Sequence, residues 1–320
     1  MVVSQYQDVV WTETPAFLPH VGNPPTWGGA AKGLSALQYK LGRACGNFTK
    51  PHWGIITLTG CGLAPTGFQP GNTEGRPAQS MTATLAAAEA AANGAVAAQL
   101  YGDTLGKDAC YPAVLQWASF VDGHRELFGP DRRKLADVAI LYSIPTHMFL
   151  NDAGIGPSGF NWPGRGLPLS DVFSGLARVA EDHGLLYDVL LMDHPSVSTF
   201  RQLESQLERF RVVVLPVVLA MSDSDAITLA SFVKGGGTLV AVDWNQTAAF
   251  DENYTLRPPS SAMSGSRSPI LQSLVAQPGR GAVKFLNNEL YRYAFKGCPL
   301  LQPTSALTCA TVQAGINYYY

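Results

Sequence analysis

Short apolar runs that alternate with helical segments constrain the fold of this chain more than any other feature of its sequence. Five such runs lie at residues 137–142, 187–191, 210–215, 238–242 and 282–286. Their length and branched side chains are typical of strands that are buried on both faces. Strands that alternate with helices imply parallel pairing with right-handed crossovers. We therefore predict an α/β domain with a flavodoxin-like, doubly wound parallel sheet over residues 135–295, followed by a tail at residues 296–320.

The segments between these runs carry helix signals. Residues 171–183 have apolar side chains at helical spacing, and Gly184 stands just past their end. Ser222 is of a type that caps helix N-termini, and the glycines at 235–237 are typical of a helix end. The sequence therefore predicts a helix between the third and fourth runs, beginning just after Ser222.

The sequence around the third and fourth runs resembles a known family. Residues 210–226 combine a buried strand, a proline and an acidic helix start, and residues 231–241 lead through three glycines into the next strand. This pattern is similar to the β-galactosidase trimerisation domain, which follows the catalytic barrel in family 42 glycoside hydrolases. The resemblance implies an amidotransferase-like domain that serves in assembly, and hence a homo-oligomer. Amidotransferases need a thiol nucleophile after the strand at 238–242, where this chain has Asp243, so we expect no such activity.

Residues 1–130 contain a separate series of predicted strands and helices. Strands are predicted at 8–13, 52–59 and 94–101, and helices at 27–43, 79–92 and 111–127. Three such units match the last three of a (β/α)8 barrel, and residues 93–129 are similar to the eighth unit of the same glycosidases. A complete barrel takes about 250 residues. The sequence therefore predicts a partial barrel at residues 1–130, ahead of the second domain.

Composition and charge exclude several classes of partner. The net charge is −2 and no long basic run is present, which argues against a nucleic-acid or anionic-membrane partner. No apolar run approaches the ~20 residues of a transmembrane helix, and no signal peptide is visible at the N-terminus. The five cysteines are scattered, without the spacing of a zinc site. We expect a cytoplasmic protein with no metal and no other cofactor.

The candidate catalytic residues stand at the carboxyl ends of the barrel strands, where barrel enzymes carry their chemistry. Glycoside hydrolysis needs two carboxyl groups, about 5 to 9.5 Å apart. Glu13 ends the first strand and Asp103 follows the third, so these two are the predicted pair. The strand ending at Thr59 carries no carboxylate, although family 42 enzymes hold their nucleophilic Glu on the strand that it resembles. The candidate substrate-binding residues are Trp11, His52, Trp53 and Glu74.

Three functions remain open on the sequence alone. The leading hypothesis is a glycoside hydrolase-related protein that hydrolyses O-glycosidic bonds of a carbohydrate by acid/base catalysis. The second is a non-catalytic assembly or sugar-binding protein that kept the scaffold without the acid/base pair. The third is an esterase-type hydrolase with an unconventional serine. Ser231 and Lys234 fit an SxxK motif, but they lie at the end of a predicted helix rather than at its start, where a serine hydrolase needs them.

Overall fold

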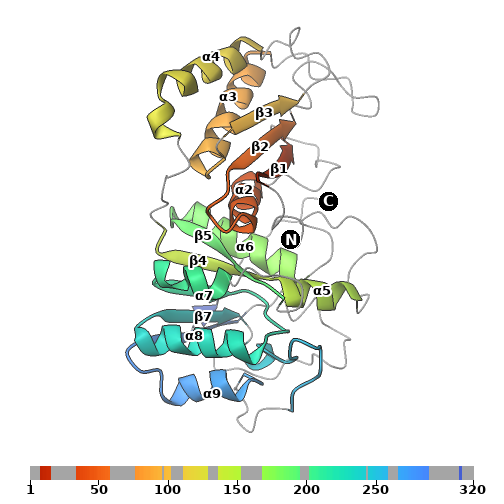
Figure 1. Cartoon of the computed structure of the whole chain (residues 1–320), viewed down its shortest axis with the longest axis vertical. Coiled ribbons are helices and arrows are strands. Elements are labelled where there is room, and N and C mark those ends of the chain that lie inside the picture. Colours follow the sequence, from red (N-terminus) through yellow and green to blue (C-terminus); the bar gives the residue numbers. More distant parts are fainter. Residues whose placement is uncertain are drawn as a thin grey trace. The chain divides into compact units, whose positions relative to one another are not determined.

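The chain folds into two compact units, Met1–Lys134 (unit 1) and Leu135–Tyr320 (unit 2) (Figure 1). A computed structural model describes both. The described residues are 8–15, 34–57, 76–95, 97–101, 111–128, 136–152, 168–194, 202–242, 244–258, 266–287 and 310–311.

Unit 1 contains a three-stranded parallel sheet in the order β1-β2-β3. Its strands and helices alternate along the chain, as the sequence predicts (Figure 1). The elements are β1 (Val10–Pro15), α2 (Leu34–Cys45), β2 (His52–Thr57), α3 (Arg76–Ala92), β3 (Ala97–Tyr101), α4 (Tyr111–Gly123) and the 3-10 helix η3 (Arg125–Leu127).

Glycine residues let α2 approach one face of this sheet closely. A Cβ atom at Gly54 of β2 would lie 2.8 Å from the ring of Tyr39 in α2. A Cβ atom at Gly42 of α2 would lie 2.5 Å from the methyl group of Thr12 in β1. A larger residue at either position would push the helix away from the sheet. The glycines therefore determine which face of the sheet α2 covers.

Two of the element boundaries that differ from the prediction in unit 1 lie at glycines. Gly94, predicted to open a strand, has a φ angle of 93° and ends α3, where its N–H donates to the Ala91 carbonyl at 3.1 Å. Glycine adopts this left-handed conformation without steric cost, which suits a helix end, and β3 begins only at Ala97. The helix predicted at 111–127 ends at Gly123, a poor helix former, and continues as η3.

Unit 2 contains a six-stranded parallel sheet in the order β5-β4-β6-β7-β8-β9. The five strands predicted from the apolar runs are all present, and β9 adds a short strand beside β8. The strands are β4 (Val138–Ser143), β5 (Tyr187–Met192), β6 (Val212–Leu215), β7 (Thr238–Val242), β8 (Ala282–Asn287) and β9 (Ala310–Thr311). The helices are α5 (Ile144–Asp152), α6 (Pro168–Asp182), α7 (Gln202–Gln206), α8 (Asp223–Gly235), α9 (Pro269–Ala276) and the 3-10 helices η4 (Leu207–Arg209) and η5 (Trp244–Gln246).

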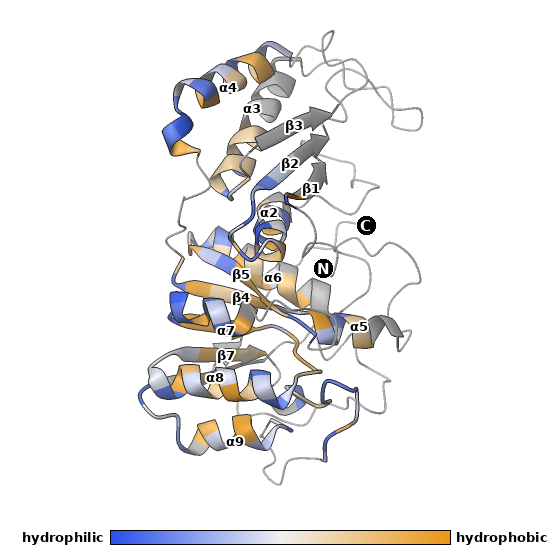
Figure 2. Ribbon diagram, viewed as in Figure 1, coloured by the Kyte–Doolittle hydropathy of each residue, from blue (hydrophilic) through white to orange (hydrophobic). Residues whose placement is uncertain are grey.

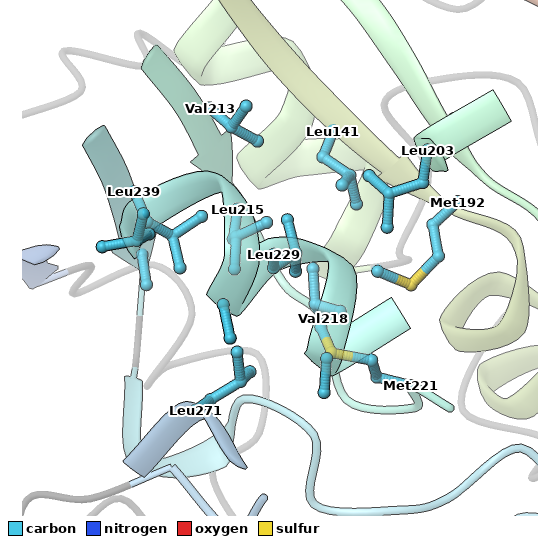
Figure 3. Packing of buried hydrophobic residues seen from close by; sticks show 14 of the residues in the cluster. Leu141, Met192, Leu203, Val213, Leu215, Val218, Met221, Leu229, Leu239 and Leu271 are labelled. Atoms are coloured by element: carbon cyan, nitrogen blue, oxygen red, sulfur yellow. The ribbon is translucent and has the colours of Figure 1, made fainter. Parts of the chain in front are cut away.

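The core of unit 2 has two layers, one on each face of the sheet. The larger layer brings α7, α8 and α9 against the strands, and Figure 3 shows Leu203, Leu229 and Leu271 of these helices among strand residues such as Leu141 and Leu215. The smaller layer includes residues of α5 and α6 together with Val242 at the end of β7. Burial on both faces explains why these strands are apolar without alternation.

The ends of α8 confirm the sequence prediction. The hydroxyl oxygen of Ser222 accepts the N–H of Asp225 at 3.1 Å and the same hydroxyl donates to the Asp225 carboxylate at 2.6 Å. The helix ends at Gly235, and Gly236 has a φ angle of 122°. Ser222 is thus an N-cap, and the glycine run provides the left-handed residue that stops the helix.

Candidate functional site

The predicted site residues of unit 1 lie on β1 and β2, whose register the structure defines. Trp11 is opposite Trp53, and Glu13 is opposite Ile55. Residues that lie opposite each other in neighbouring strands share a face of the sheet, so positions 11, 13 and 53 lie on one face. Glu13 stands two residues before the end of β1 at Pro15. The side chain of Trp53 is 48% exposed, which is unusual for a large aromatic residue on a sheet.

His52 belongs to the opposite face of the same strand. Its side chain is buried, its Nε2 lies 2.8 Å from the hydroxyl oxygen of Thr12, and its ring centroid is 6.0 Å from that of Tyr39 in α2. The structure therefore brings Trp53 to the strand positions of Trp11 and Glu13, and it directs His52 to the helix-covered side. His52 thus makes a hydrogen bond that joins the neighbouring strands β1 and β2.

The other predicted site residues lie outside what the structure describes. Asp103 and Glu74 are outside the described residues, and so are the side chains of Trp11 and Glu13. Across the three strands of unit 1, Glu13 is the one carboxylate. Their roles as catalytic and substrate-binding residues stay predictions of the sequence.

In unit 2 hydrogen bonds join the segments that follow the carboxyl ends of β4 and β6. In open α/β sheets this is where the strand order reverses and where ligands bind. Here the buried hydroxyl oxygen of Thr146, at the start of α5, accepts the N–H groups of Leu219 (3.0 Å) and Ala220 (3.1 Å), which follow β6. The hydroxyl of Ser143, at the end of β4, donates to the same oxygen at 2.8 Å. These bonds tie the two strand ends together.

The role of Thr146 could not be predicted from the sequence, because its hydrogen-bond partners are distant along the chain. Leu219 is 73 residues away from it. A threonine that follows a buried strand by three residues is one local signal, but such residues serve many turns and caps. The sequence alone gave no reason to connect it with the segment after β6.

Two histidines near the carboxyl edge of the sheet also have protein partners. Nδ1 of His147 lies 3.0 Å from the hydroxyl of Tyr142, and burial lowers the pKa of His147 below its ordinary value of 6.5 because the charged form is poorly solvated. Nε2 of His194 lies 3.0 Å from the carbonyl of Glu252, so this nitrogen carries the hydrogen. Both side chains serve contacts within unit 2.

The candidate nucleophiles of unit 2 have no catalytic arrangement among the described residues. The hydroxyl of Ser231 donates to the Ile227 carbonyl of its own helix at 2.9 Å, a common bond for serine within a helix. Asp243 lies outside the described residues. The next residue, Trp244, is buried and belongs to the larger core layer.

Metal and membrane sites were sought over the same part of the chain. Among the described residues, no group of three His, Cys, Asp or Glu side chains could hold a metal ion. No helix within that part is both long and apolar enough to cross a membrane.

Comparison with known proteins gives a family match for most of unit 2. Residues 136–319 match the family described as the β-galactosidase trimerisation domain. No curated protein sequence matches the chain.

Solved β-galactosidases share the fold. The enzyme from Rahnella sp. R3 has 16% identity and a TM-score of 0.56, with 80% of this chain and 36% of that chain covered. The GH42 enzyme from G. stearothermophilus has 18% identity and a TM-score of 0.54, with 79% and 35% covered. The enzyme from Bacillus circulans sp. alkalophilus has 18% identity and a TM-score of 0.52, with 81% and 35% covered. This chain thus spans about a third of the length of each enzyme.

Proposed function

Because this chain belongs to the family of the β-galactosidase trimerisation domain through residues 136–319, we propose that unit 2 assembles copies of the protein and performs no chemistry. The observation that carries this proposal is the hydrogen bonding of Thr146. It lies beside the ends of β4 and β6, where open α/β sheets bind ligands, and its hydroxyl oxygen accepts two main-chain N–H groups that follow β6. The strand order of the first five strands, with β4 between β5 and β6, supports a flavodoxin-like fold for this unit.

For unit 1 the proposal is the final part of a (β/α)8 barrel of a glycoside hydrolase-related protein. Three parallel β/α units in sequence support it. The match to β-galactosidase structures covers 80% of the chain, more than unit 2 contains, so it includes residues of unit 1. The carbohydrate substrate and the hydrolysis of its O-glycosidic bond follow from this proposal. The scattered cysteines support a cytoplasmic location.

The catalytic role falls to Glu13, with Asp103 as its candidate partner. Glu13 stands near the carboxyl end of β1, the end at which barrel enzymes carry catalytic residues. Trp53 belongs to the neighbouring strand β2, at a position on the same face of the sheet as position 13. It supplies an exposed aromatic surface, and sugars stack on such surfaces. In this proposal Trp11 extends that surface, and Glu74 is a further substrate-binding candidate. His52 was a candidate of the sequence as well, but it lies buried on the opposite face of β2.

Sugar binding without catalysis is the second candidate, and the exposure of Trp53 favours it equally. A titration of intrinsic fluorescence with galactosides, run beside a hydrolysis assay, separates the two. Binding together with turnover supports the hydrolase. Binding with no turnover supports the sugar-binding protein.

The assembly role is tested by the mass of the purified chain in solution. We expect multi-angle light scattering at micromolar concentration to give a multiple of 34.2 kDa. A particle that stays at the mass of one chain over a hundredfold range of concentration contradicts the assembly role.

A further inference from the structure

One Asn-Gly pair occurs in the sequence, Asn93-Gly94, and it follows directly after α3. Asparagine is among the chemically labile residues of proteins. The main-chain nitrogen of the next residue can attack its side-chain amide carbon. Glycine at that next position hinders the attack least, because it has no Cβ atom and its backbone turns freely. The pair is therefore the position of this chain at which spontaneous loss of the side-chain amide is most favoured.

The fold holds the two reacting groups of this pair apart. The side-chain nitrogen of Asn93 donates to the Glu89 carbonyl at 2.9 Å, so the side chain lies back along the helix toward the preceding turn. The main-chain N–H of Gly94 donates to the Ala91 carbonyl at 3.1 Å. Both hydrogen bonds have to break before the Gly94 nitrogen can reach the amide carbon of Asn93.

The last turn of α3 maintains this arrangement. The helix leading into it is largely alanine, the best helix former, as the pale orange of the described part of α3 in Figure 2 shows. The N–H of Ala95 donates back to the Ala90 carbonyl at 3.0 Å, and Gly94 has a φ angle of 93°. This is the bonding of a closed helix C-terminus. Helix ends open locally at a smaller free-energy cost than the core of a domain, so this turn opens before unit 1 unfolds.

We propose that Asn93 is a deamidation site whose rate is controlled by opening of the last turn of α3. In the open form the Gly94 nitrogen forms a bond to Cγ of Asn93, and the bond from Cγ to Nδ2 breaks. The amide nitrogen leaves as ammonia and takes the proton that the Gly94 nitrogen gives up. Water then opens the cyclic imide at Cγ, which gives aspartate, or at the main-chain carbonyl, which gives isoaspartate. Water is the one co-reactant.

The isoaspartate product does not fit the closed turn. Its main chain runs through Cβ, which adds one carbon atom to the link between α3 and β3. Little room exists there, because a Cβ atom at Gly94 would already lie 2.8 Å from Cδ of Arg43, a buried side chain, and Ala95 is buried as well. Modification is therefore expected to loosen the joint between α3 and β3. Neither the assembly role nor the glycosidase role uses this site, so the inference stands apart from both.

Incubation of the purified full-length chain at mildly alkaline pH tests the proposal. Peptide mass spectrometry measures asparagine, aspartate and isoaspartate at position 93, in the folded protein and in urea. We expect product in both samples, at a rate at least about tenfold lower in the folded protein, because the closed turn predominates there.

Two glycine substitutions within α3 distinguish opening of the last turn from unfolding of the whole helix. Ala92→Gly changes an exposed residue of the last turn, so it should raise the folded rate about two- to fivefold and leave the rate in urea unchanged. Ala86→Gly is the matched control near the middle of the same helix, and its folded rate should equal that of the unchanged chain.

Three results overturn the inference. Absence of product at position 93 in urea would show that the pair does not react. Equal rates in the folded protein and in urea would show that the last turn gives no protection. A folded rate that Ala92→Gly does not raise, or that Ala86→Gly raises as much, would show that opening of this turn does not control the reaction.

Discussion

Replacement of Thr146 by valine tests the hydrogen bonds that join the ends of β4 and β6 in unit 2. Valine has the shape of threonine and exchanges the hydroxyl for a methyl group, so packing is kept and hydrogen bonding is lost. The N–H groups of Leu219 and Ala220 then lose the oxygen that accepts them, and the Ser143 hydroxyl loses its acceptor. All of these groups are buried, so water does not replace the lost partner.

The loss in the free energy of unfolding follows from the number of N–H donors left without an acceptor. A buried donor left without a partner costs about 1–3 kcal/mol, and two main-chain donors are stranded here. We therefore expect Thr146→Val to lower the free energy of unfolding by about 2–6 kcal/mol. Thr146→Ser keeps the oxygen and loses one methyl group, so it should cost only about 1 kcal/mol. Since whole domains are stable by about 5–15 kcal/mol, this difference is large.

The assay is urea unfolding followed by the fluorescence of the tryptophans, of which Trp244 is buried in unit 2, together with circular dichroism. The two variants and the unchanged chain should share the slope of free energy against urea, which ensures that the midpoints compare stabilities. If Thr146→Val and Thr146→Ser unfold within about 0.5 kcal/mol of each other, the hydroxyl does not hold the two strand ends together.

Two further predictions concern single side chains. Burial lowers the pKa of His147 below 6.5, so its folded form resists protonation, and stability should fall as pH drops below about 6.5; the loss in unfolding free energy caused by His147→Gln should then be smaller at pH 5 than at pH 7.5, and equal losses at both would contradict this. Glu13→Gln keeps the size of the side chain and removes its titrating proton, so it should lower any glycosidase activity by ~10²- to 10⁴-fold, whereas unchanged activity would exclude Glu13 as the catalytic acid.

Local patterns in the sequence were enough for the strands and helices of unit 2. Its strands are apolar runs because both faces are covered, and Pro216 and Gly236 stand directly after β6 and α8. Ser222 could be identified as an N-cap because the bond it makes reaches only three residues along the chain. Features governed by neighbours in the sequence were therefore predictable.

Features governed by distant contacts were not. Gly94 looked like the start of a strand, since a glycine before an apolar run carries no sign of the φ angle of 93° that makes it a helix end. The register that sets Trp11 opposite Trp53 joins residues 42 positions apart, so no local pattern in the sequence reveals it. His52 and Trp53 are neighbours in β2 and therefore lie on opposite faces of the sheet. Which of these faces α2 covers depends on long-range packing, and the sequence analysis grouped the two residues as one site.

The second carboxylate decides whether this chain can hydrolyse a glycoside by itself. Glycoside hydrolysis needs two carboxyl groups, and the strands of unit 1 supply Glu13 alone. A partner within this polypeptide has to come from a segment between the strands, for which Asp103 is the candidate. Activity of the purified chain that Asp103→Asn abolishes would place the pair within this polypeptide. Activity that survives Asp103→Asn would rule out Asp103 as the second carboxylate.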